Sequence, residues 1–159
     1  DAPPPPADRA SGAGRFVVAV ITCAETGLDV PAALGLRAED VLMLSNAGGR
    51  IDGGDLALIE RAASENRLSL CIVLTHADCT AHSSAATTSA TAIAQRRRVA
   101  IERAHALLTQ EQLLAASDPL RARTEARSFA VVAATIDART ARVQWLVPRA
   151  ETMPIAPVR

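Results

Sequence analysis

Two short runs of apolar residues limit the fold of this chain more than any other feature. They are Phe16–Ile21 and Leu68–Leu74; each is almost continuously apolar, and the first is rich in valine. A run of this length and composition is typical of a strand that is buried on both faces of a parallel sheet. The chain is therefore expected to form an α/β domain.

Further strand-like and helix-like segments alternate along the rest of the chain. A terminal hairpin follows them, with a turn predicted over residues 137–140. We therefore predict a mainly parallel central sheet flanked by helices, with an antiparallel edge strand from the C-terminal hairpin. The segments are a strand at Val41–Leu44, a helix around residues 56–63, a long helix from Ser89 to Leu114 ended by Asp118 and Pro119, and strands at Phe129–Ile136 and Val143–Val147.

Length and composition fit one domain preceded by an arm. Residues 1–14 are rich in proline and glycine and are expected to form a flexible arm or linker, so the domain is assigned to residues 15–159. The chain begins at Asp1 rather than Met, which fits either a processed chain or a domain of a longer protein. Seventeen basic residues balance seventeen acidic ones, which argues against a nucleic-acid or membrane partner and favours a small molecule.

The three cysteines favour a reducing compartment and a metal site. An odd number cannot pair evenly, and Cys23, Cys71 and Cys79 lack the dense spacing of a secreted disulfide scaffold. The chain has no run of about 20 apolar residues that would span a membrane, and its first residues do not resemble a signal peptide. A cytoplasmic location is therefore expected.

Cys23, His76 and Cys79 are the candidate metal ligands. Cys23 follows the first predicted strand, whereas His76 and Cys79 follow the strand that ends near Leu74. Ligands gather at the carboxyl ends of strands in open parallel sheets. Because thiolate sulfur and imidazole nitrogen are preferred zinc ligands, we predict that these three residues hold one zinc ion.

Three motifs resemble those of the beta-class carbonic anhydrases in order and spacing. The C-terminal hairpin is also similar to the closing hairpin of that family, so the resemblance extends from about Arg15 to Pro148. It implies a homodimer or higher even oligomer, and a zinc-bound hydroxide that converts carbon dioxide to bicarbonate. The motifs are VAVITCAETG from Val18, LSNAG from Leu44 and CIVLTHADC from Cys71.

One motif departs from the family pattern. The family reads Cys-x-Asp-Ser-Arg, and its arginine holds the aspartate, which orients the hydroxide. Here Glu25 takes the place of the aspartate and Gly27 that of the arginine. Glu25 is therefore expected to be an unrestrained carboxylate that acts in catalysis or moves onto zinc as a fourth ligand, so that hydration is weakened. Arg50 is an alternative partner for Glu25, although a solvated surface position is favoured for it.

Three functions remain open from the sequence. The first is a carbonic anhydrase-type zinc lyase. The second is a non-catalytic homologue with a closed structural zinc site, serving assembly or regulation. The third is a hydrolase of another small linear molecule such as carbonyl sulfide, because the same hydroxide would attack it.

Several other residues are assigned by their position near the predicted ligands. Asn46 and Gly48 lie in a glycine-rich loop expected beside the pocket, and Asp78 is either a carboxylate that supports a ligand or a cap of the turn. His82 is expected to be a surface histidine rather than a proton shuttle. Cys71 is expected in the core and outside the metal site. The remaining candidates, Arg96, Arg97 and Arg98, are expected on a solvated helix surface.

Overall fold

The computed structural model describes residues 16–82 and 92–146. The predicted arm at residues 1–14 and the first residues of the predicted long helix lie outside this part of the chain. In the described part, no helix is long and apolar enough to cross a membrane.

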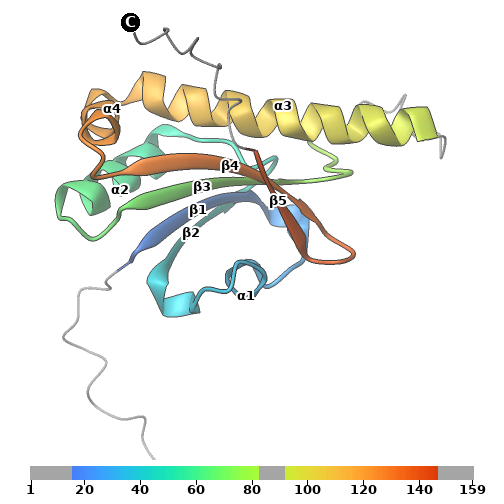
Figure 1. Ribbon diagram of the computed structural model, residues 1–159, viewed down its shortest axis with the longest axis horizontal. Helices are drawn as coiled ribbons and strands as arrows, with labels where there is room; N and C mark the ends of the chain where they lie inside the picture. The colour runs from blue at the N-terminus through green and yellow to red at the C-terminus, as the bar shows by residue number, and fades with distance from the viewer. Residues whose placement is uncertain (1–15, 83–91, 147–159) are drawn as a thin grey trace, which may run out of the picture.

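A single sheet forms the centre of the described structure (Figure 1). The strand order is β2-β1-β3-β4-β5, and all neighbouring pairs are parallel except β4 and β5, which are antiparallel. The predicted fold class is therefore confirmed. The strands are β1 (Val18–Cys23), β2 (Val41–Asn46), β3 (Leu70–His76), β4 (Ala130–Asp137) and β5 (Arg142–Leu146).

Helices lie on both sides of this sheet. In Figure 1 the long helix α3 runs along one side, and the short helix α1 lies on the other. Pro119 does not merely end a helix, because Ser117 caps a new one, accepting a hydrogen bond from the Leu120 N–H at 3.2 Å. The helical segments are η2 (Ala24–Thr26), α1 (Val30–Ala33), η3 (Ala38–Asp40), α2 (Gly53–Ser64), α3 (Ala92–Ala116) and α4 (Asp118–Glu125).

Alternating residues of the buried strands build two separate cores. In β3, Cys71 and Val73 pack on the side of α2 and α3, whereas Ile72 and Leu74 pack on the side of α1. Successive side chains point to opposite faces of the sheet, and both faces are covered. The strand sequences are therefore continuously apolar instead of alternating between apolar and polar residues.

The ends of the strands are more polar than their centres. β3 continues two residues beyond the predicted end at Leu74, because Thr75 and His76 still pair with Thr135 and Ile136 of β4. Thr75 and His76 are nevertheless buried. The sheet thus carries polar side chains into its interior only at this edge, next to the candidate ligands.

Candidate metal centre

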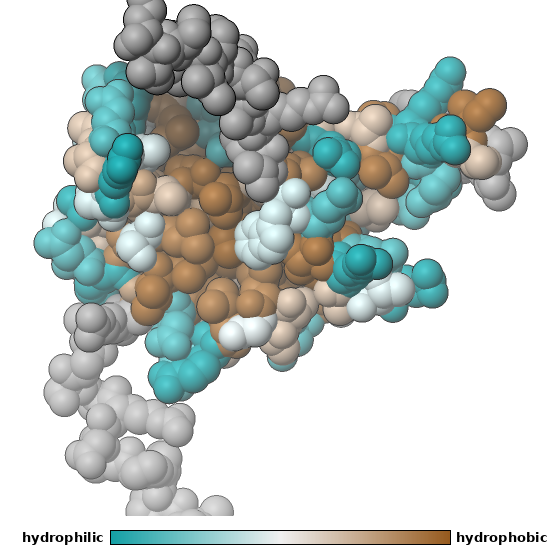
Figure 2. Space-filling view, in the orientation of Figure 1, coloured by the Kyte–Doolittle hydropathy of each residue, from teal (hydrophilic) through white to brown (hydrophobic). Residues whose placement is uncertain are grey.

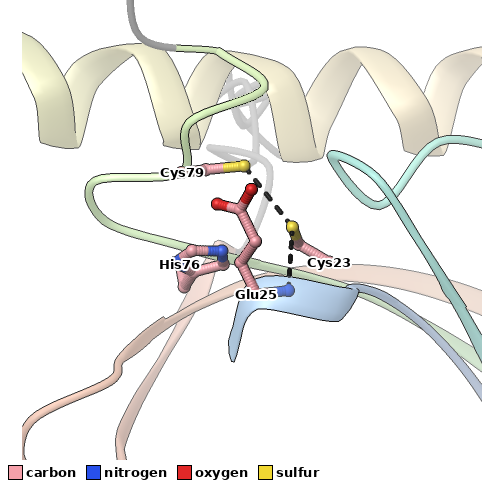
Figure 3. Close-up of side chains that lie close together, drawn as sticks. All are labelled: Cys23, Glu25, His76 and Cys79. Carbon is pink, nitrogen blue, oxygen red and sulfur yellow. Dashed lines mark hydrogen bonds between the residues drawn. The ribbon is translucent and has the colours of Figure 1, made fainter. Parts of the chain in front are cut away.

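The predicted ligands converge at the carboxyl ends of β1 and β3 (Figure 3). Cys23 is the last residue of β1, His76 is the last residue of β3, and Cys79 lies in the turn that follows. The parallel register pairs Thr22 with Leu74, so the two strands end side by side. Residues more than 50 positions apart in the sequence therefore meet at one point.

The donor atoms of this cluster are close enough to share one ion. Sulfur atoms of Cys23 and Cys79, a ring nitrogen of His76 and a carboxylate oxygen of Glu25 all lie within 4.8 Å of one another. The two sulfur atoms are 3.5 Å apart, close to the roughly 3.7 Å expected for two thiolates on a tetrahedral zinc. The residues fit a zinc site.

The hydrogen bonds of His76 select the nitrogen that would bind a metal. Its Nδ1 lies 2.9 Å from the backbone oxygen of Ala77, and a carbonyl oxygen can only accept, so Nδ1 carries the proton. The other nitrogen, Nε2, therefore has a free lone pair. It is buried and has no hydrogen-bond partner among the described residues. A metal ligand would satisfy this atom.

Two backbone donors surround the Cys23 sulfur, as is typical of a metal-binding thiolate. The backbone N–H of Gly48 donates to Cys23 Sγ at 3.3 Å, and the N–H of Glu25 donates to the same atom at 3.4 Å. Burial and the neighbouring Cys23 raise the pKa of Cys79. Two adjacent buried sulfurs become thiolates together only if a cation compensates their charge.

Glu25 is restrained, and the expectation that its carboxylate is free was wrong. The backbone N–H of Thr80 donates to Glu25 Oε2 at 2.9 Å, and the Thr80 hydroxyl donates to Oε1. These two bonds lower the pKa of Glu25, so the exposed carboxyl group is ionised at neutral pH. Thr80 was missed in the sequence because a polar residue after Cys79 carries no signal of its partner.

No protein-family model matches the chain, and no curated protein sequence matches it. Solved structures do match. Carbonic anhydrase from Streptococcus mutans is 25% identical with a TM-score of 0.60, and the match covers 83% of this chain and 81% of that one. The wild-type beta-carbonic anhydrase CafD of Aspergillus fumigatus is 16% identical with a TM-score of 0.70, over 91% of this chain and 95% of that one. The chain has the beta-carbonic anhydrase fold. A further match is the beta-carbonic anhydrase of Coccomyxa in complex with acetazolamide, with 14% identity, a TM-score of 0.71 and coverage of 87% and 75%.

On this beta-carbonic anhydrase fold, the glycine-rich loop packs directly on Cys23. Gly48 and Gly49 both have positive φ angles, and a Cβ on Gly49 would lie 3.1 Å from the backbone nitrogen of Cys23. Asn46 pairs with Cys23 across β2 and β1, and its side chain closes the loop, because its Oδ1 accepts from the Arg50 N–H and its Nδ2 donates to the Arg50 carbonyl. Arg50 is exposed, as favoured, and makes no ion pair with Glu25 in the described structure.

Asp78 and the arginine run differ from their predicted roles. The Asp78 carboxylate pairs with Arg98 of α3 at 2.6 Å rather than with a ligand. The prediction that this whole run is solvated was therefore wrong for Arg98, whose side chain is only 17% exposed. Asp78 also has a φ of 64°, which the tight turn between His76 and Cys79 requires.

His82 is not a surface residue, so that expectation was also wrong. Its side chain is 9% exposed, its Nδ1 lies 3.2 Å from a carboxylate oxygen of Glu102, and its ring packs on that of His105 with centroids 3.8 Å apart. His105 in turn donates from Nε2 to the Gly48 carbonyl at 2.9 Å. Burial raises the pKa of Glu102 to about 7. In the sequence, the helical spacing of Glu102, His105 and Thr109 is the single signal of this buried polar cluster.

Cys71 lies where it was predicted, in the core and away from the ligands. It is fully buried near the start of β3, and burial raises the pKa of its thiol to about 12.

Proposed function

We propose that this protein is a zinc-dependent, carbonic anhydrase-like lyase that reversibly hydrates carbon dioxide to bicarbonate. Cys23, His76 and Cys79 would be the metal ligands. The observation that supports the proposal most strongly is the unpartnered Nε2 of His76, buried beside two sulfurs that are 3.5 Å apart. Bound zinc would supply a Lewis acid that makes a water molecule nucleophilic near neutral pH.

Glu25 would be the catalytic carboxylate. It is ionised and lies at the exposed side of the ligand cluster, so it can accept a hydrogen bond but cannot donate one. A cavity of about 390 Å³ lies beside it and offers a route for a small substrate. Its lining includes Glu25, His76, Asp78, Gln95, Asp137 and Arg139.

Hydration is expected to be weaker than in an efficient carbonic anhydrase. The family resemblance assigns the carboxylate an arginine partner, whereas Gly27 stands at that position. Gly27 has a φ of 62° and no atom except the Glu25 carbonyl within 4 Å of an added Cβ. There is room for a side chain at this position, but arginine would be strained there.

A closed structural zinc site is the second candidate. It is supported by the position of Glu25, whose carboxylate oxygen lies within 4.8 Å of each of the other three donor atoms. A fourth protein ligand would remove the open position that hydration requires. The protein would then serve assembly or regulation.

Stopped-flow measurement of carbon dioxide hydration separates the two candidates. Zinc-loaded wild-type protein is expected to accelerate hydration measurably, and Glu25→Ala to reduce the rate while zinc remains bound. A wild-type rate equal to the uncatalysed rate, with one zinc per chain, would reject the lyase and favour the closed site. A rate typical of an efficient enzyme would show that the arginine is dispensable here.

We also propose a homodimer or higher even oligomer. Figure 2 shows apolar residues gathered over the middle of the visible face of the sheet. Trp145 on the edge strand β5 is 50% exposed, and such apolar surface is typical of an interface. Carbonic anhydrases of the same fold from Sordaria macrospora are tetrameric. Light scattering at micromolar concentration is expected to give an even multiple of the 16.6 kDa chain mass, and a strict monomer would contradict this.

A further inference from the structure

The contact between Glu25 and Thr80 joins the two segments that carry the cysteine ligands. Glu25 lies two residues after Cys23, and Thr80 directly follows Cys79. The two partners are 55 positions apart in the sequence and come from the ends of different strands. Their hydrogen bonds therefore cross the metal centre from one ligand-bearing segment to the other.

Thr80 binds both oxygens of the carboxylate at once. Its backbone N–H reaches Oε2 at 2.9 Å, and its hydroxyl reaches Oε1. Two donors from one residue fix both the position and the plane of a carboxylate, whereas a single bond would leave it free to rotate. Each oxygen keeps a further lone pair for another partner.

No cationic side chain shares this task in the described part of the chain. Glu25 forms no ion pair there, either with Arg50, the alternative partner considered from the sequence, or with another cation. The position and orientation of the Glu25 carboxylate therefore depend on Thr80. The hydroxyl of Thr80 has no other hydrogen bond among the described residues.

We propose that Thr80 is a positioning residue of the metal centre, which fixes the Glu25 carboxylate beside the ligands and holds the Cys23 and Cys79 segments together before a metal binds. This proposal rests on the proposed metal site but not on its catalytic activity. Thr80 acts through Glu25, so its contribution should disappear when Glu25 is removed.

The test compares the zinc affinity of two substitutions at Thr80. Thr80→Val keeps the shape and the backbone donor but removes the hydroxyl, whereas Thr80→Ser restores the hydroxyl. In competition with a chromophoric chelator, Thr80→Val is expected to bind zinc about tenfold more weakly, the usual cost of losing a residue that orients a metal ligand set. Thr80→Ser should match the wild type. Thr124→Val is the matched control, because the Thr124 hydroxyl bonds to the Leu120 carbonyl in α4, far along the chain from the ligands.

A double-mutant cycle separates this role from a structural one. In the Glu25→Ala background, Thr80→Val should change the zinc affinity by less than about twofold, since its partner is gone. The visible absorption of the cobalt(II)-loaded protein should change in Thr80→Val and in Glu25→Ala alike, and return in Thr80→Ser. This absorption reports the geometry around the metal rather than the stability of the fold.

Several outcomes would overturn the proposal. One is that Thr80→Val and wild type have equal zinc affinities and equal cobalt spectra. Another is that Thr80→Val loses the same zinc affinity in the wild-type and in the Glu25→Ala background. If Thr80→Val does not fold, the comparison of Glu25→Ala with wild type carries the test, and an unchanged zinc affinity and cobalt spectrum of Glu25→Ala would reject the proposal. A wild-type protein that binds zinc but hydrates no carbon dioxide would reject the lyase while leaving this proposal intact.

Discussion

The interior of β3 and the turn that follows this strand use cysteine in opposite ways. Cys71 and Cys79 are both almost completely buried, at 0% and 1% exposure. Cys71 has Ala19 and Val131 as its neighbours in the adjoining strands, and its thiol is protonated because burial disfavours the charge. Cys79 instead lies 3.5 Å from another sulfur and next to the unpartnered nitrogen of His76. Burial alone therefore does not distinguish a ligand from a core residue.

What distinguishes them is their position along the sheet. Within the strand, at Cys71, the backbone bonds to both neighbouring strands and the side chains face covered apolar layers. At the carboxyl end this pairing stops, and turns bring backbone donors such as the Gly48 N–H to the side chains. The following predictions test this difference between the two positions.

The largest effect is expected for the ligands themselves. Changing Cys23 and Cys79 together to serine should reduce zinc from one ion per chain to background, because two of three proposed protein ligands lose their affinity for zinc. Elemental analysis after purification without chelators measures this. Cys71→Ser should keep its zinc, and full retention by the double variant would refute the assigned ligands.

Gly49→Ala tests how closely the loop must approach Cys23. The new Cβ would lie 3.1 Å from the backbone of Thr22 and Cys23, at a φ of 61°. The left-handed conformation and the crowding together should lower the free energy of unfolding by about 3 kcal/mol and weaken zinc binding.

Gly35→Ala is the control for this substitution. Gly35 also has a positive φ, of 69°, but its added Cβ would meet no atom within 4 Å. It should lose only about 1 kcal/mol and keep its zinc affinity. Chemical denaturation and chelator competition measure both quantities, and equal zinc affinities of the two variants would show that the close approach is unimportant.

Cys71→Ala tests the position inside the strand. Removing a buried sulfur from a packed core should lower the free energy of unfolding by about 1–2 kcal/mol. Zinc content should stay at one per chain, because the thiol lies among Ala19, Ile21 and Val73 of the apolar core. A loss of zinc in this variant would break the distinction between the two positions.

The smallest effect is a dependence of stability on alkaline pH. The Cys71 thiol has a pKa of about 12 in the folded chain against an ordinary value of 9.0, so the folded state binds this proton more tightly. Its stabilising contribution is complete below pH 9 and is lost as the pH rises from 9 towards 12. Wild type should therefore lose about 1 kcal/mol more than Cys71→Ala between pH 8 and pH 10. Denaturation at several pH values measures this, and an equal fall in the free energy of unfolding for wild type and Cys71→Ala would contradict it.

The sequence predicted that Cys23, His76 and Cys79 lie close together, because the signal for each of them is local. Cys23 and His76 each follow a recognisable buried strand, and parallel strands end at one edge of the sheet. The same reasoning placed Cys71 in the core. The sheet class and the terminal hairpin followed from residue periodicity in the same way.

The partners of these residues depend on tertiary packing and were not predicted. Thr80 reaches Glu25 only because the turn after His76 folds back over η2. His82, Glu102 and His105 meet only where α3 crosses the end of the sheet. Periodicity places a polar residue on a helix or turn but does not identify the group that it faces.

The parallel register of β1 and β3 has a consequence for how this site can change. Side chains alternate between the faces of a strand, and Thr75 bonds to the backbone of α3 while His76 belongs to the metal cluster. One residue inserted inside β3 would exchange these two side chains and remove an essential nitrogen from the cluster. An insertion after Ser64, where α2 has ended, would leave the pairing of the strands unaltered. Insertions and deletions are therefore expected to be tolerated in the loops between the strands and helices. The lengths of β1, with six residues, and of β3, with seven, are expected to stay constant.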